Sequence, residues 1–100
     1  MTIRHVVTWK LAAEDAAVRA EQAAEVARRL NALEGVVPQL RSISAGANVA
    51  YPDANWDVTL VADFASIEEL EAYQVHPAHE EDVAYVRSVV ASRVAVDFEA

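Results

Sequence analysis

Two parts of the chain alternate between hydrophobic and polar residues, a pattern typical of β-strands with one buried face. The clear alternations cover residues 3–11 and 56–64, a weaker one predicts a strand at 40–48, and a last strand is predicted at 93–98. In the strands at 3–11 and 56–64, the side expected to face a core carries Ile3, His5, Val7, Trp9 and Leu11, then Trp56, Val58, Leu60, Ala62 and Phe64.

A spacing of three to four residues predicts a long helix over 15–33, where Asp15 suits the N-cap and Gly35 a left-handed C-terminal turn. Residues 66–69, Ser-Ile-Glu-Glu, form a capping box that opens a second, short helix. Pro77 ends that helix and can open a third. The buried stripe expected on the long helix is Val18, Gln22, Val26, Leu30 and Leu33.

The resulting order is strand, helix, strand, strand, helix pair, strand. It predicts an α+β fold, a ferredoxin-like sandwich whose four-stranded antiparallel sheet carries helices on one face. A length of 100 residues predicts a single domain over residues 1–100. Gly46 suggests a bulge or the close approach of another backbone.

The sheet face away from the helices is expected to be polar at its ends and partly apolar in its middle. Such a face suits either solvent or a partner sheet. In the last strand, Val94, Val96 and Phe98 share one side, which assigns Ala95 and Asp97 to the outer face. The other residues expected there are Arg4, Val6, Thr8, Lys10, Asp57, Thr59, Val61 and Asp63.

Composition narrows the functional classes. The hydrophobic fraction is 54% but rich in alanine, so a monomer would have a thin core and oligomerisation is favoured. The absence of cysteine excludes disulfides and thiolate catalysis and suits a cytoplasmic protein. The net charge of −8 argues against nucleic acid and anionic membranes as partners. Neither a secretory signal nor an apolar run of about 18 residues is evident.

The segment from Tyr73 to His79, Tyr-Gln-Val-His-Pro-Ala-His, holds two of the three histidines beside one of the three tyrosines. Histidine exchanges protons near neutral pH, so this cluster at a helix break is a candidate acid/base site. If helices cover the strand face of His5, then Tyr73, His76 and His79 can converge with it on one cavity. A helix-capping histidine and a packed core histidine are the structural alternatives.

Other chemistry has less support. Three histidines can supply three zinc ligands, but two of them, separated by a proline, do not share a regular helical face. No Gly-x-Ser-x-Gly elbow is present, and residues 46–48 lack the glycine spacing of a phosphate loop. Asp57 and Asp63 are interpreted as solvated or interface charges. We therefore expect no metal and no cofactor.

The sequence resembles the stress-responsive A/B barrel (Dabb) family over nearly its whole length. This resemblance implies a homodimer in which two ferredoxin-like sheets close into a dimeric α+β barrel. The residues that carry it are His5-Val6-Val7-Thr8-Trp9-Lys10-Leu11, Leu30, Leu33, Gly35, Pro38, Gly46, Asn48, Phe64, Leu70, Tyr73, His76, Pro77 and His79.

Within that family, the first-strand histidine and the Tyr-x-x-His-Pro-Ala-His segment resemble plant polyketide cyclases of the olivetolic acid cyclase type. The likeness implies that His79 is the catalytic base, that Tyr73 is its hydrogen-bonding partner and that His5 lines the pocket. It does not extend to the substrate. The residues expected to shape the pocket or its loop are His76, Pro77 and Trp9.

The leading hypothesis is a homodimer whose pocket takes a small apolar or polyketide-like molecule and which acts as a cyclase or lyase through histidine acid/base chemistry. The alternative is a non-catalytic, stress-associated module that binds a ligand without converting it. A monooxygenase-like α+β barrel is a third reading, although no further histidine remains as an axial haem ligand.

Overall fold

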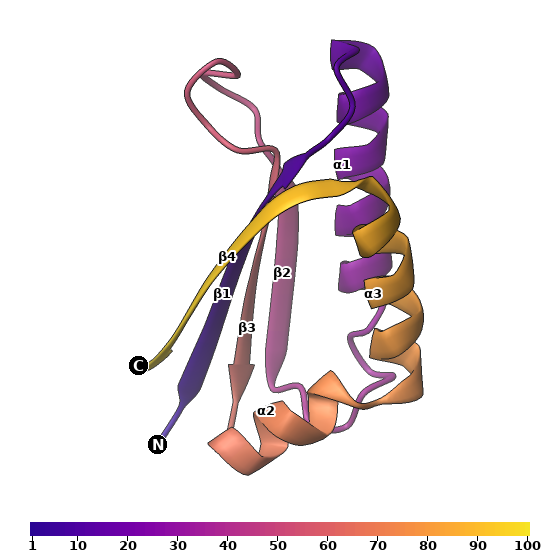
Figure 1. The fold of residues 1–100 in the computed structure, drawn as a ribbon. Helices are drawn as coiled ribbons and strands as arrows, with labels where there is room; N and C mark the ends of the chain where they lie inside the picture. Colours follow the sequence, from indigo (N-terminus) through magenta and orange to yellow (C-terminus); the bar gives the residue numbers. More distant parts are fainter.

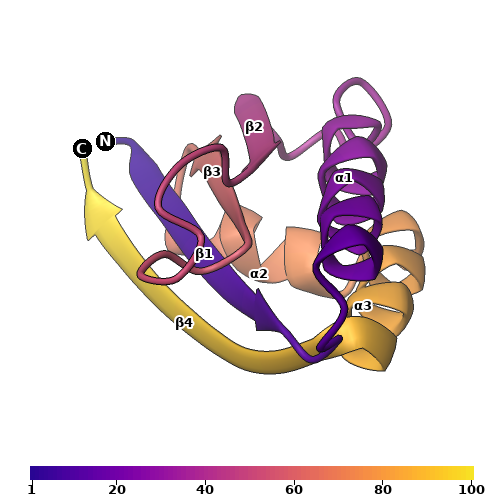
Figure 2. The same cartoon turned by 90° about the horizontal axis from the view of Figure 1, so that it is seen from above.

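The computed structural model describes residues 1–100 as four strands and three helices (Figure 1). The strands form one antiparallel sheet in the order β2-β3-β1-β4, and α1 and α3 cover one of its faces (Figure 2). The predicted ferredoxin-like α+β fold is thereby confirmed. The elements are β1 (Ile3–Leu11), α1 (Ala16–Asn31), β2 (Ser42–Ala47), β3 (Val58–Phe64), α2 (Ile67–Gln74), α3 (Pro77–Val89) and β4 (Val90–Glu99).

The core lies between the sheet and the two covering helices. Val7 and Leu60 contribute from the central strands β1 and β3, while Val26 and Leu30 contribute from α1. Each such side chain stabilises the fold by roughly 1.5–3 kcal/mol when it is fully buried. The buried face of β1 is the predicted one. None of the three helices has both the length and the apolar character needed to cross a membrane.

The helix boundaries follow the predicted caps with small differences. Asp15 accepts hydrogen bonds from the amides of Ala17 and Val18 at 2.9 and 3.0 Å, so α1 begins at the next residue. The helix ends at Asn31, and Gly35, with φ of 80°, lies in the turn that follows. The expected burial of Val18 is wrong: it is 43% exposed, because α1 extends beyond the sheet at that end (Figure 1).

Two expectations for β2 and β3 also need correction. β3 begins at Val58 instead of Trp56, and Trp56 lies half-buried in the preceding loop. Gly46 pairs with Thr59 in an unbroken register, and a Cβ built at Gly46 would meet no atom within 4 Å. The glycine therefore marks neither a bulge nor a close backbone approach.

The irregularity in the sheet is instead where β4 joins β1, with a register shift between Lys10 and Leu11. Beyond it, Asp97 lies opposite His5 and Val96 lies opposite Val6. Residues directly opposite each other in an antiparallel pair point to the same face, so Asp97 faces the helices.

The predicted facing of β4 is therefore wrong. Ala95 and Asp97 lie on the helix side, while Val94, Val96 and Phe98 lie on the outer face. The alternation along β4 was predicted correctly. The faces were assigned on the rule that apolar residues point to the core, and this strand does not follow that rule. The outer face consequently carries an exposed apolar patch, defined here by Val61, Val94, Val96 and Phe98.

Asp57 and Asp63 do not remain solvated charges, because each contacts a basic group. Asp63 lies opposite Arg4 and accepts two hydrogen bonds from its guanidinium at 2.8 and 3.0 Å, which lowers the pKa of the carboxyl. Asp57 accepts a hydrogen bond from the amide of Leu11 at 2.8 Å and lies 3.3 Å from Nε of Arg19. Asp57 thus ties the end of β1 to α1 at the point where the β4 register shifts.

We predict that Asp57→Ala destabilises the protein by about 1–3 kcal/mol, because the Leu11 amide loses its side-chain acceptor. Urea unfolding followed by circular dichroism measures the effect. Asp53→Ala is the matched control, since Asp53 is exposed in the same loop and forms no side-chain hydrogen bond or salt bridge. Equal unfolding midpoints for the two variants would contradict the assigned role of Asp57.

Candidate functional site

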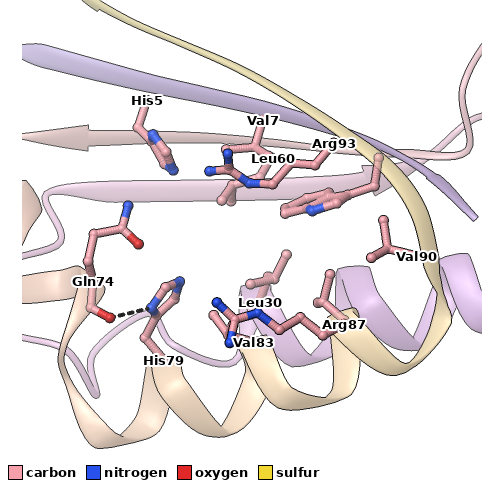
Figure 3. Close-up of a pocket in the computed structure, with 12 residues that line it drawn as sticks. His5, Val7, Leu30, Leu60, Gln74, His79, Val83, Arg87, Val90 and Arg93 are labelled. Carbon is pink, nitrogen blue, oxygen red and sulfur yellow. Dashed lines mark hydrogen bonds between the residues drawn. The ribbon is translucent and has the colours of Figure 1, made fainter.

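A cavity of about 190 Å³ lies between the inner face of the sheet and α3 (Figure 3). Most of its wall is apolar, and its polar groups come from β1, β4, the end of α2 and α3. The apolar lining residues are Val7, Trp9, Leu30, Leu60, Val83, Val86 and Val90. The polar ones are His5, Gln74, His79, Arg87 and Arg93.

His5 lies on β1 and is 3% exposed. Its Nδ1 contacts a carboxylate oxygen of Asp97, which β4 places directly opposite. A carboxylate only accepts hydrogen bonds, so Nδ1 carries the proton in this pair. Nε2 forms no hydrogen bond to the protein and remains available to a ligand, in the arrangement by which a carboxylate orients a histidine base.

His79 lies in the first turn of α3 and is 7% exposed. Its Nδ1 donates a hydrogen bond to the carbonyl oxygen of Gln74 at 3.2 Å, which also leaves Nε2 without a protein partner. Burial is the main cause that lowers the pKa of His79 below its ordinary value of 6.5, and nearby His5 and Arg93 lower it further. The ring is therefore neutral at pH 7 and competent to accept a proton. Figure 3 shows His5 and His79 on opposite sides of the cavity.

Tyr73 contributes its ring to the site without lining the cavity. It is fully buried, with ring centroids 4.1 Å from His79 and 5.0 Å from Phe64. Its hydroxyl is buried without a hydrogen-bond partner, and burial raises its pKa well above the usual range. The structure thus brings Tyr73 beside His79 as a packing partner, and places its hydroxyl outside the cavity lining.

His76 does not join the cavity either. Its Nδ1 accepts a hydrogen bond from the amide of Ala78 at 3.1 Å, so His76 is the N-cap of α3 and Pro77 is the first helical residue. The expected convergence of His76 with His79 is wrong, because the cap turns the His76 ring toward the backbone. The helix-capping alternative describes this residue. Trp9 does line the cavity, as a residue that shapes the pocket would.

Sequence reasoning missed four polar residues of the site: Gln74, Arg87, Arg93 and Asp97. Asp97 and Arg93 were missed because β4 was predicted to turn its other face toward the helices. Arg87 was missed because it belongs to no motif that the sequence analysis recognised. No group of three or more His, Asp or Glu side chains is arranged to hold a metal ion. The polar lining is thus two imidazoles, one amide and two guanidinium groups.

The family model for the stress-responsive A/B barrel domain matches residues 3–100. The chain belongs to this family. The matched range includes the segments around His5 and His79 that carry the sequence resemblance. No curated protein matches the chain.

Solved structures share the fold over almost the whole chain. A dimeric ferredoxin-like protein of unknown function from Bacteroides fragilis has 23% identity and a TM-score of 0.90, with 99% of this chain and 96% of that chain covered. A second dimeric ferredoxin-like protein of unknown function, from Thermobifida fusca, has 30% identity and a TM-score of 0.85, with 100% of this chain and 92% of that chain covered. The hydroxynitrile lyase from Passiflora edulis has 12% identity and a TM-score of 0.77, with 97% and 91% covered.

The lowered pKa of His79 predicts a contribution to the pH dependence of stability. The unfolded chain takes up the proton first, near pH 6.5, so stability falls as the pH drops from that value toward the lower folded-state pKa. We expect the wild type to lose more unfolding free energy than His79→Gln between about pH 8 and pH 5. Urea titrations at a series of pH values measure the difference, and parallel curves would contradict a buried neutral His79.

Proposed function

We propose that this protein is a small-molecule enzyme of the lyase or cyclase type that transfers protons through histidine and needs no cofactor. One observation carries the proposal: two buried histidines line one cavity, and each is fixed through Nδ1 while its Nε2 lacks a protein partner. Oriented imidazoles with an available nitrogen are what general acid/base catalysis requires.

In this proposal His79 is the base. Its buried, neutral ring would remove a proton from a carbon beside a carbonyl group of the ligand. The second imidazole, His5, would act in its doubly protonated form, with Nδ1–H paired to Asp97 and the Nε2 proton donated to the developing enolate oxygen. The Asp97 carboxylate would stabilise this imidazolium before the proton is given up.

Tyr73 takes a positioning role in this scheme. Its ring centroid lies 4.1 Å from that of His79, and this packing restricts how the imidazole can turn. A donor role toward the ligand would require its buried hydroxyl to reach the cavity. His76 and Pro77 support the site by fixing where α3 begins.

The ligand is a small, mainly apolar molecule with at least one carbonyl group, a class that includes polyketide-like compounds. Support comes from the apolar walls formed by Trp9, Leu60 and Val86. The hydroxynitrile lyase from Passiflora edulis is an example of this fold in an enzyme. A non-catalytic ligand-binding module is the alternative, in which the same cavity holds its ligand unchanged.

We predict that the protein accelerates deuterium uptake from D₂O into the methyl group of acetophenone. Proton NMR measures this uptake as loss of the methyl signal. His79→Ala should lower this rate by about 10²-fold or more, the usual effect of losing a general base. His76→Asn is the matched control: it removes a histidine but keeps a good helix N-cap, so its rate should stay near that of the wild type. If the wild type binds acetophenone measurably but does not raise the exchange rate above that without protein, the binding module is favoured.

We further propose that two copies of the chain pair through the outer sheet face as a closed α+β barrel. The apolar patch supports this, since Val94 is 51% exposed, Val96 60% and Phe98 44% in the single chain. Exposed apolar patches on a sheet mark interaction surfaces. The related structures from Bacteroides fragilis and Thermobifida fusca are described as dimeric.

Light scattering should give a mass of twice the 10.9 kDa chain for the wild type. Val96→Lys should shift it toward a single chain, because the lysine places a charge in the centre of the apolar patch. Val75→Lys is the matched control: Val75 is 68% exposed, similar to Val96, but caps the end of α2 away from the patch. Dissociation by both variants, or by neither, would contradict pairing through this face.

A further inference from the structure

Arg87 and Arg93 differ from the other arginines of the chain. Both line the cavity, and neither forms a salt bridge or a side-chain hydrogen bond. This is notable in a chain with 16 acidic residues and only 8 lysines and arginines. The remaining arginines all have side-chain partners: Arg4 with Asp63, Arg19 with Asp57, Arg28 and Arg29 with Glu25, and Arg41 with Thr2.

The two arginines reach the cavity from opposite sides. Arg87 extends from α3 and Arg93 from β4, where the register places it opposite Trp9. In Figure 3 both guanidinium groups point along the cavity toward the end where His5 and His79 lie. Arg93 is also one of the charges that act on His79, which is consistent with this proximity.

The cavity wall contains no carboxylate to balance these charges. Its other polar groups are the neutral His79, the amide of Gln74 and His5, whose Nδ1 contacts Asp97. Arginine stays protonated at any accessible pH, so the two guanidinium groups supply fixed positive charge and parallel N–H donors. Such donors match the two oxygens of a carboxylate.

We propose that the cavity binds a small organic carboxylate whose anionic group is held by Arg87 and Arg93. Its apolar part would pack against Trp9 and Leu60. The volume of about 190 Å³ suits one aromatic ring with a small substituent, since a cavity of about 150 Å³ accommodates benzene. The inference deepens the proposed function, because it names the substrate class of the same cavity and leaves proton transfer to the histidines.

Calorimetric titration with benzoate tests this assignment, with benzamide as a neutral probe of nearly the same shape and inorganic phosphate as a free anion. Benzoate should bind at least about tenfold more tightly than benzamide, because charge-assisted hydrogen bonds are the stronger ones. The double variant Arg87→Gln/Arg93→Gln should abolish that preference. Both positions are exposed, so the variant should fold normally, as circular dichroism would verify.

Lys10→Gln is the control for charge: it removes one positive charge at an exposed residue outside this cavity and should retain the preference for benzoate. The proposal is overturned if benzoate and benzamide bind equally, if benzoate does not bind, or if the double variant keeps the preference. Phosphate binding as tight as that of benzoate would overturn the assignment of an organic acid.

This experiment separates the proposal from the acid/base function. Arginine-dependent benzoate binding without any proton exchange into acetophenone would support the carboxylate site and reject the enzyme. The opposite result is proton exchange that depends on His79 and is unchanged in the Arg87→Gln/Arg93→Gln variant, together with equal binding of benzoate and benzamide. That result would support the acid/base enzyme and reject the carboxylate site.

Discussion

The pairing of β4 with β1 is the constraint on which the rest of the structure depends. Because side chains alternate along a strand, a shift of one residue moves every side chain of that strand to the opposite face. The irregularity after Lys10 sets the register that turns Asp97 and Arg93 toward the helices. The same register exposes Val96 and its apolar neighbours on the outer face. The candidate site and the proposed dimer surface are thus two results of one alignment.

The two cavity histidines show how similar residues acquire different properties from their surroundings. His79 is held by a backbone carbonyl and shielded from water, which penalises its charged form. His5 is held by the carboxylate of Asp97, which compensates positive charge on its ring. A neutral imidazole facing one whose Nδ1–H is paired with a carboxylate is a suitable pair for moving a proton across a ligand.

The sequence was sufficient for the fold, because β1 and β3 alternate strongly and the caps at Asp15 and Ser66 mark where α1 and α2 begin. It also predicted that His5 and His79 converge on one cavity, which both residues line. It failed where distant segments decide the outcome: the facing of β4 depends on a bulge that leaves no glycine or proline signal. The role of His76 was decided by one local hydrogen bond to Ala78 that competes with the cavity for its ring.

The contact between His5 and Asp97 joins residues 92 positions apart, and this separation has a consequence for how the protein folds. During synthesis, β1 through α3 leave the ribosome before β4, so a nascent chain contains both histidines but lacks Asp97 and Arg93. Contacts of such long range carry the largest loop-closure cost and tend to form late. The cavity therefore gains its full polar lining only when β4 completes the sheet.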